Sequence, residues 1–233
     1  MDKSTAEQLV ARQTYWHHRW EIFPGVVTPG VYEPVQILKN MDWPADMTGW
    51  RVLDVGACDG YFSFQAAMRG ADVTAFDFRS KTQNGFAIAE AINGRELRYV
   101  QDNVMNLPQV FAGEQFDMIL FLGVLYHLPD PLGALWSLRL LCQSALYLET
   151  IYSDDKQEAP LMRYLPGASF ANDITNFWSP NLACLKAMLE DTGFELLTKL
   201  PDTQRVLMKD KPSTPNGRSR KMSIAGQRRF SDQ

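Results

Sequence analysis

The segment Asp54-Val-Gly56-Ala-Cys58-Asp59-Gly60 decides the fold class of this chain. It directly follows the apolar stretch Trp50-Arg-Val-Leu53, and an acidic strand end, Asp77, comes 21 residues after Gly56. A short strand that ends in a glycine-bearing turn, with an acid about twenty residues further on, is typical of a βαβ unit that binds a nucleoside. In such a unit the acid accepts both hydroxyls of the ribose.

The turn itself separates two classes of nucleoside cofactor. Dinucleotide-binding turns use a third glycine so that the helix N-terminus can approach a pyrophosphate, whereas Cys58 stands between Gly56 and Gly60 here. This disfavours an NAD-dependent oxidoreductase. A cofactor without phosphates, such as S-adenosylmethionine, suits an early carboxylate like Asp54, which would meet its ammonium group. At this point the chain resembles the class I methyltransferases, and the alternative is an ordinary strand-turn-helix unit without a ligand.

Strand-like and helix-like segments alternate along the chain, which predicts the α/β class. We expect a Rossmann-like, seven-stranded, mostly parallel sheet with helices on both faces. Seven strands also suit a methyltransferase. The expected strands are 51–56, 72–77, 97–101, 116–123, 145–150, 194–199 and 204–209.

Two helix starts are expected where a capping residue is directly followed by proline. Asp130-Pro131 predicts an N-cap followed by proline at the first helical position. Ser179-Pro180 predicts the same arrangement for a later helix that ends at Gly193. The leucines expected to face the core from these helices are Leu132, Leu135, Leu138 and Leu141 in the first and Leu182, Leu185 and Leu189 in the second.

The chain divides into three expected parts. Residues 1–49 should form an N-terminal cap or lid, residues 50–210 a class I methyltransferase domain, and residues 211–233 a basic, mobile tail. Within the domain, residues 151–178 interrupt the alternation as an insertion after the fifth strand. Ligands of open α/β sheets lie beyond the carboxyl ends of the strands, so the cap and the insertion should make the acceptor site.

Composition excludes several classes of protein. Hydrophobic residues make up 45% of the chain and charged residues 21%, which is typical of a globular protein. The longest apolar run, Met118 to Tyr126, is too short to span a membrane, and the charged N-terminus does not resemble a secretion signal. We therefore expect a cytoplasmic protein without a membrane partner. A homodimer is left open.

The charge of the chain bears on nucleic-acid binding. A net charge of −4 and a pI near 5.4 give no overall field that attracts RNA. Residues 205–229 nevertheless hold eight basic residues against one acid, so RNA stays a less favoured partner than a small molecule. The Ser, Pro, Asn and Gly content of the tail favours a solvated segment instead.

The expected cofactor residues follow from the strand ends. Asp54 and Gly56 should border the methionine end of the cofactor, and Asp77 should bind the ribose through a charge-assisted bidentate pair. The segment 102–104, just past the third strand, is where such folds meet the adenine. A helix N-cap is the alternative role for Asp77, and a turn residue for Asp102. The complete expected set is Asp54, Gly56, Asp59, Gly60, Asp77, Phe78, Asp102, Asn103, Val104 and Leu122.

Tyr126 and His127, at the end of the fourth strand, are the expected catalytic residues. His127 has the side chain whose ordinary pKa lies nearest neutrality, so it suits a general base for an acceptor hydroxyl. A loop histidine that orders the turn is an equal alternative. His17 and His18 are placed on the presumed first helix, where they point about 100° apart and would not chelate one metal. We expect no metal site.

A further series of motifs narrows the family. The motifs are Gly123-Val-Leu-Tyr-His127, Leu148-Glu-Thr150, Arg163-Tyr164, Phe177-Trp-Ser-Pro180 and Leu189-Glu-Asp-Thr-Gly193-Phe194. This series resembles the bacterial family typified by the tRNA wobble-uridine carboxymethyltransferase, over about residues 14–210. That resemblance implies carboxy-S-adenosylmethionine as an alternative donor, a hydroxyuridine oxygen as acceptor, and a lysine, a tyrosine and an arginine that hold the donor's carboxylate. Tyr126 and Arg205 match the tyrosine and the arginine.

The chain departs from this family at two points. The lysine has no clear counterpart, since Arg19 is the only cation of the segment 16–25 that could stand in for it. We also expect no counterpart of the long N-terminal extension of the wobble enzyme. We therefore expect methyl transfer to a small molecule, such as a natural product, with an oxygen as the expected acceptor atom. Carboxymethyl transfer to tRNA and a non-catalytic scaffold are the alternatives.

The expected acceptor wall is aromatic, as many small-molecule pockets are. Each of its residues taken alone suits a core position better, and it is their concentration in the two segments outside the alternation that makes a pocket an equal alternative. The wall comprises Trp16, Trp20, Phe23, Tyr32, Tyr152, Arg163, Tyr164, Phe177 and Trp178, with Arg205 as a further substrate-binding candidate.

Overall fold

A computed structural model describes residues 1–153, 157–201 and 205–212; the expected tail at 213–233 lies outside them. Its centre is a seven-stranded sheet in the order β10-β11-β7-β6-β3-β4-β5. Neighbouring strands run parallel from β7 to β5, whereas β11 is antiparallel to both β7 and β10. The expected α/β class is confirmed. The strands are β3 (Arg51–Val55), β4 (Asp72–Asp77), β5 (Arg98–Gln101), β6 (Phe116–Leu122), β7 (Cys142–Ile151), β10 (Phe194–Pro201) and β11 (Arg205–Pro212).

The central strands are buried on both faces, and alternate residues enter two separate cores. In β6, Met118 and Leu120 join one core, whereas Ile119 and Phe121 join the other. The first core packs against α1 (Lys3–Arg12), α3 (Tyr61–Ala67) and α4 (Phe86–Asn93). The second packs against α5 (Leu107–Val110), α6 (Pro131–Leu141) and α7 (Leu182–Asp191).

The start of α6 is as expected. Asp130 caps the helix by accepting a hydrogen bond from the backbone N–H of Gly133 at 2.8 Å, and Pro131 is the first helical residue. Leu135, Leu138 and Leu141 are buried, but Leu132 is 39% exposed because it lies in the first turn, on the solvent side.

The expected start of α7 is wrong. Residues Trp178–Pro180 form strand β9, which pairs antiparallel with β8 (Met162–Tyr164). The cap is Asn181, whose Oδ1 accepts from the backbone N–H of Cys184 at 2.8 Å. The helix ends at the expected place, with Gly193 at a φ of +87° just beyond it.

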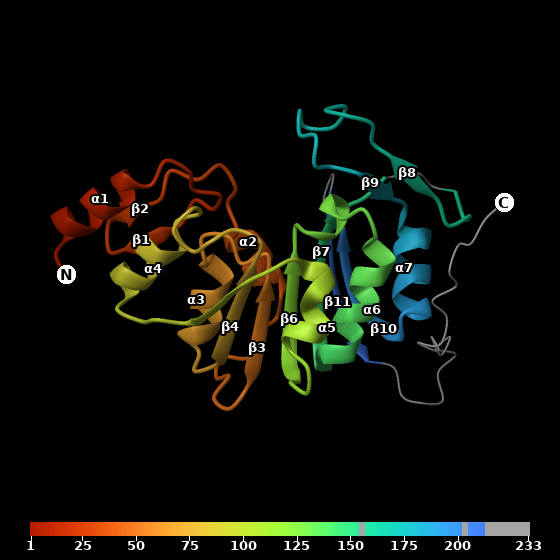
Figure 1. The fold of residues 1–233 in the computed structure, drawn as a ribbon, viewed down its shortest axis with the longest axis horizontal. Coiled ribbons are helices and arrows are strands. Elements are labelled where there is room, and N and C mark those ends of the chain that lie inside the picture. The colour runs from red at the N-terminus through yellow and green to blue at the C-terminus, as the bar shows by residue number, and fades with distance from the viewer. Residues whose placement is uncertain (154–156, 202–204, 213–233) are drawn as a thin grey trace, which may run out of the picture.

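The presumed first helix is shorter than expected, because α1 ends at Arg12, before His17 and His18. The chain then forms the small strands β1 (Glu21–Phe23) and β2 (Val26–Val27) and the short helix α2 (Val35–Asn40). Two 3-10 helices, η1 (Val104–Asn106) and η2 (Leu125–His127), follow β5 and β6. Figure 1 shows the N-terminal segment and the β8–β9 segment above the same edge of the sheet, one over each half.

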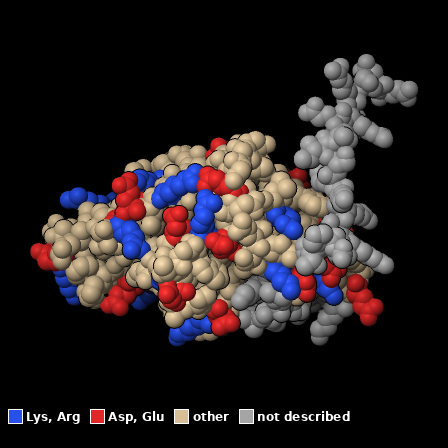
Figure 2. Space-filling model, turned by 90° about the horizontal axis from the view of Figure 1, so that it is seen from below, with Lys and Arg blue, Asp and Glu red and all other residues tan. Residues whose placement is uncertain are grey.

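The opposite side of the molecule carries mixed charges. Figure 2, seen from below, shows acidic and basic side chains interspersed among neutral ones. At the start of β3 and β5, Arg51 and Arg98 both form ion pairs with Glu114, with N–O distances of 2.6 and 2.7 Å. One acid therefore pairs with two bases at this position.

Candidate functional site

The glycine turn after β3 is held in a left-handed conformation. Gly56 has a φ of +80°, and a Cβ added there would lie 2.4 Å from Cγ2 of Val124 in the loop after β6. The backbone N–H groups of Gly56 and Ala57 donate to the carbonyl of Phe76 in β4, at 2.8 and 3.1 Å. Only glycine fits this close approach of two strand ends.

Gly60 completes the turn, with a φ of +86°, directly before helix α3. A Cβ there would lie 2.8 Å from Cε2 of Phe64. The turn therefore leads into α3 as the sequence motif predicts. The positive φ values and the close contacts explain why glycine occupies both positions.

Asp77 lies at the carboxyl end of β4, 4% exposed. One carboxylate oxygen accepts from the backbone N–H of Cys58 in the turn, and the other from that of Arg79, each at 2.9 Å. The carboxylate therefore joins the turn to the end of β4. Each oxygen keeps a second lone pair, and a vicinal pair of ribose hydroxyls suits a carboxylate held in this way.

Asp54 is 3% exposed and accepts a hydrogen bond from Ser63 Oγ at 2.6 Å. Burial raises the pKa of its carboxyl to about 6; the nearby charge of Asp77 acts in the same direction, while Ser63 and His18 act in the opposite one. An ammonium group beside Asp54 would relieve this cost of burial. The site thus fits the cationic methionine end of S-adenosylmethionine.

Asp59 is also fully buried, but its partners are within the chain. One oxygen accepts from the backbone N–H groups of His17 and His18 at 3.0 and 2.7 Å, and the other lies 2.5 Å from Nδ1 of His18. The turn is thereby bonded to the N-terminal segment. These contacts give Asp59 a structural role that the expected cofactor role did not include.

The remaining expected cofactor residues line the ends of β4, β5 and β6. Phe78 is 65% exposed, and the guanidinium carbon of Arg79 lies 4.5 Å from the centre of its ring. Asp102 follows β5 and binds the backbone N–H of Asn103 and the side chain of Asn106. Val104 begins η1 and is buried, and Leu122 is the partly buried last residue of β6.

Tyr126 and His127 lie in η2, just beyond β6. Tyr126 is 6% exposed and packs with Ile151, Leu165 and Phe170. Nδ1 of His127 lies 2.9 Å from Oγ1 and 3.1 Å from the carbonyl oxygen of Thr175, in the loop before β9. These contacts are the ones expected of a loop histidine that orders its surroundings, while a role as base stays a prediction.

The N-terminal aromatic residues separate into two groups. Trp16 and Trp20 are 3% and 4% exposed. Both belong to the core and not to an exposed acceptor wall. Tyr32 is partly exposed and stacks on His17, with ring centres 5.5 Å apart. Tyr15, which sequence reasoning did not single out, is 46% exposed, and its hydroxyl lies 3.1 Å from Nδ1 of His17.

The β8–β9 segment brings together several members of the expected wall. Tyr164 and Trp178 face each other across the two strands, with ring centres 5.4 Å apart. The backbone N–H of Phe177 donates to the carbonyl of Tyr126 at 2.9 Å. Arg163 is exposed, and Tyr152 is partly buried against the second core. Arg205 begins β11 opposite Ile151.

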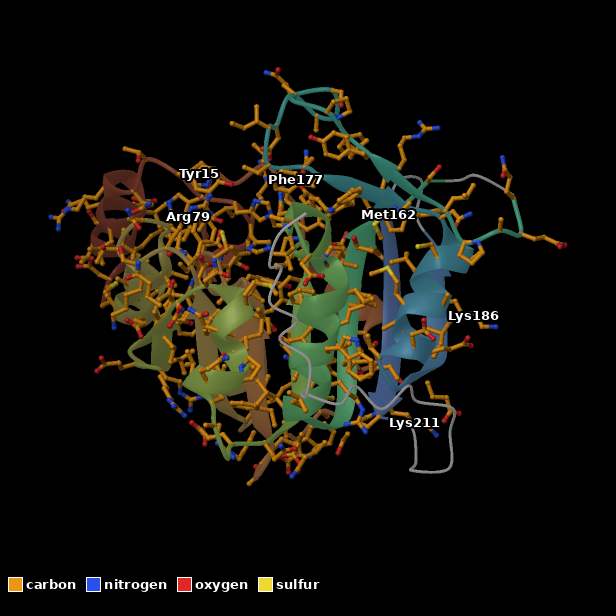
Figure 3. The ribbon with its side chains drawn as sticks, turned by 45° about the vertical axis from the view of Figure 1, so that its right-hand side comes forward. Tyr15, Arg79, Met162, Phe177, Lys186 and Lys211 are labelled. Atoms are coloured by element: carbon orange, nitrogen blue, oxygen red, sulfur yellow. The ribbon has the colours of Figure 1, made fainter. Side chains whose placement is uncertain are left out.

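Tyr15, Arg79 and Thr175 are further residues beside the candidate site that the sequence did not reveal. Figure 3 shows Tyr15 and Arg79 near each other above the sheet, with Phe177 further along the same edge. Arg79 could have been found from its place two residues after Asp77. Tyr15 and Thr175 lie in irregular segments whose positions depend on contacts distant in sequence, so no local pattern marks them.

The part of the chain that the structure describes holds no cluster of three or more His, Cys, Asp or Glu side chains suited to a metal ion. Within those same residues no helix has the length and apolar character that crossing a membrane requires.

Comparison with known proteins identifies the domain type. Residues 34–199 match the family model described as a methyltransferase domain. A relative from Campylobacter hominis, named tRNA U34 carboxymethyltransferase, is 32% identical over 180 residues, which are 71% of this chain and 61% of that protein. The chain spans about half the length of several other curated relatives with the same name. The family resemblance expected from the motifs is confirmed.

Solved structures of methyltransferases share the fold. The N-terminal domain of EvdMO1, crystallised in the presence of SAH and D-fucose, has a TM-score of 0.66 and 20% identity, and the match covers 91% of this chain and 97% of that chain. The Burkholderia thailandensis 1,6-didemethyltoxoflavin-N1-methyltransferase, with bound 1,6-didemethyltoxoflavin and S-adenosylhomocysteine, has a TM-score of 0.57 and 21% identity; 72% of each chain is covered.

Proposed function

The chain belongs to the methyltransferase domain family, and we propose that it transfers a methyl group from S-adenosylmethionine to an oxygen of a small-molecule acceptor. One observation carries the proposal. Two buried acids, Asp54 and Asp77, lie at the ends of adjacent parallel strands, beside a glycine turn that no larger residue fits. This arrangement suits a ligand with an ammonium group at one end and a ribose near the other.

The proposed roles follow from the geometry. Asp77 accepts the ribose hydroxyls, and Asp54 faces the ammonium group of the methionine end. Phe78 packs against the adenine, whose edge Asp102 to Val104 contact. When bound, the cofactor supplies an activated methyl group on a sulfonium. The chain's own task is to hold the acceptor oxygen in line with that methyl group at near-attack distance and to receive its proton.

A small acceptor is supported by one of the structural neighbours. The EvdMO1 domain was crystallised in the presence of SAH and D-fucose, and 97% of that chain is covered by the match. The partly exposed aromatic side chains of Tyr32, Phe177 and Trp178 suit an apolar face of such an acceptor. Production of S-adenosylhomocysteine in a panel of hydroxylated compounds that includes D-fucose tests the acceptor class.

The cofactor site can be tested without any acceptor. Asp77→Asn should weaken S-adenosylhomocysteine binding at least tenfold in calorimetry, because the amide replaces one acceptor oxygen and the negative charge. Asp72→Asn is the matched control, since Asp72 is the exposed residue at the opposite end of the same strand. Equal affinities in the two variants, both folded by circular dichroism, would contradict the assigned ribose site.

Carboxymethyl transfer to tRNA is the second candidate, and the named relatives favour it. It requires cations near Tyr126 to hold the additional carboxylate, and Arg205 on β11 is the matching candidate. Binding of carboxy-S-adenosylmethionine should then be at least tenfold tighter than that of S-adenosylmethionine, and Arg205→Gln should remove the difference. Equal affinity of the two donors for the wild-type chain would leave methyl transfer as the better account.

A further inference from the structure

We propose that Tyr15 and His17 form the pair that receives the acceptor's proton, held beside the methyl donor by Asp59. This inference rests on the proposed methyl transfer to an oxygen. It gives a catalytic task to the N-terminal segment and a positioning task to the buried acid of the glycine turn.

Asp59 fixes the position of the pair. Its carboxylate is 0% exposed and accepts from two consecutive backbone N–H groups, those of His17 and His18. The His18 ring lies on the other oxygen, at 2.5 Å from Nδ1. Since Asp59 belongs to the turn between β3 and α3, His17 cannot move relative to that turn without breaking buried, charge-assisted hydrogen bonds.

The N-terminal segment is braced from its other side as well. The backbone N–H groups of Val31 and Tyr32 donate to the carbonyl of His17 at 3.1 and 3.0 Å, and the Tyr32 ring stacks on the His17 ring. The His17 ring is therefore held by its backbone and by its face. Such a group keeps one orientation, as an acid or base in a catalytic site requires.

The Tyr15 hydroxyl and Nδ1 of His17 are within hydrogen-bond distance, 3.1 Å apart. Burial, together with the nearby Cys58 and Asp59, raises the pKa of the Tyr15 phenol, so this group keeps its proton near neutral pH. In the proposed pair the phenol O–H donates to Nδ1, and the ring proton is on Nε2. Nδ1 is then the nitrogen that accepts the proton.

Tyr15 also faces the site. It is 46% exposed and within electrostatic range of Cys58 and Asp59 in the turn, Arg79 after β4 and Asp173 in the loop before β9. Figure 3 shows Tyr15 and Arg79 next to each other above the sheet. The phenol thus lies between the glycine turn and the β8–β9 segment, where the proposed cofactor and acceptor meet.

The proton transfer balances without any additional reagent. The acceptor oxygen forms a bond to the methyl carbon, and the bond from that carbon to sulfur breaks, which leaves a neutral thioether. The acceptor's O–H proton passes to the Tyr15 oxygen, while the Tyr15 proton passes to Nδ1 of His17. The products are the methyl ether, S-adenosylhomocysteine and a His17 imidazolium, on a residue whose backbone N–H is bound to the Asp59 carboxylate.

Histidine NMR tests the placement directly, because the chain contains only three histidines. Proton affinity of each ring is measured in the complexes with S-adenosylmethionine and with S-adenosylhomocysteine, which differ only by the methyl group and the sulfonium charge. If His17 lies near the methyl, its proton affinity should be at least about threefold weaker in the sulfonium complex. The effects of the surrounding groups on the His17 ring cancel in this comparison, because the groups are common to both complexes. These groups are Asp59, His18, Tyr32, Cys58, Arg79 and Asp173.

Other outcomes of this experiment are decisive. Equal His17 proton affinity in the two complexes overturns the proposal, and a difference seen at His127 alone would assign the base to that residue instead. Asp59→Asn should reduce the His17 difference while S-adenosylhomocysteine still binds. If neither ligand binds in calorimetry, the proposed function itself fails, and the inference fails with it.

Turnover provides the second test, with the acceptor that the panel identifies. Tyr15→Phe and His17→Gln should each lower kcat at least tenfold with little change in the KM for S-adenosylmethionine. Their pH profiles should lose the limb that reports the imidazole. A purely structural role for the pair predicts a raised KM and an unchanged pH profile.

Discussion

At the scale of single residues, the sequence predicts the geometry of the glycine turn well because its determinants are local. Asp54, Gly56 and Asp77 are placed by one strand, one turn and the next strand, and the structure brings them together as expected. Asp59 was different. Its partners, His17 and His18, are about forty residues away and in an irregular segment, so no spacing rule reveals that this carboxylate is used within the chain.

The buried carboxylate of Asp54 gives a prediction on pH. Its pKa in the folded chain, about 6, is above the ordinary value of 3.8. The folded state therefore binds the proton more tightly than the unfolded state, and the free energy of unfolding falls as pH rises through the window from about 4 to 6. Above that window the ionised, buried carboxylate costs on the order of 3 kcal/mol.

The affinity for the cofactor should depend on the same carboxyl group, but it should rise with pH where the free energy of unfolding falls. An ammonium group favours the ionised Asp54, so the affinity for S-adenosylhomocysteine should rise about tenfold between pH 5 and pH 7. Asp54→Asn should bind weakly at both pH values and flatten the profile, whereas His18→Gln controls for the histidine next to Asp59. Calorimetry at several pH values measures this, and a profile for Asp54→Asn as steep as that of the wild-type chain would refute it.

At the scale of elements, the sequence places the buried strands well but misassigns the start of α7. The pattern Ser179-Pro180 has the local chemistry of a helix cap, yet Pro180 pairs with Met162 in β9 and β8. That pairing joins two separate segments of the chain, and the residue that caps the helix is Asn181. Non-local strand pairing thus overrides a local capping signal.

The assigned cap can be tested by paired substitutions. Asn181 is 1% exposed; besides capping α7, it accepts from the backbone N–H of Leu161 at 3.1 Å and donates to the carbonyl of Ala159 at 2.8 Å. Asn181→Ala should lower the free energy of unfolding by about 2 kcal/mol or more, since it removes a cap and leaves buried groups unpaired. Ser179→Ala should cost less than about 0.5 kcal/mol. Urea denaturation measures both, and the reverse order of the two effects would show that the cap is misassigned.

At the scale of the whole molecule, two segments outside the sheet are bonded to the loops at the carboxyl ends of its strands. The N-terminal segment is bonded to the glycine turn through Asp59, and the β8–β9 segment is bonded to η2 through Thr175 and Phe177. Both segments were expected to form the acceptor side of the site, because they interrupt the alternation of strands and helices. Their internal structure was not predictable, since it depends on side chains that bind backbone groups of distant loops.

The measurement that tests the central claim most directly is the binding of S-adenosylhomocysteine to the purified chain by calorimetry, with mass spectrometry of the small molecules released when the protein is denatured. The account predicts one site with a Kd in the micromolar range, about −8 kcal/mol, and recovery of S-adenosylmethionine or its demethylated product. No binding, together with no recovered nucleoside from a folded chain, would contradict it.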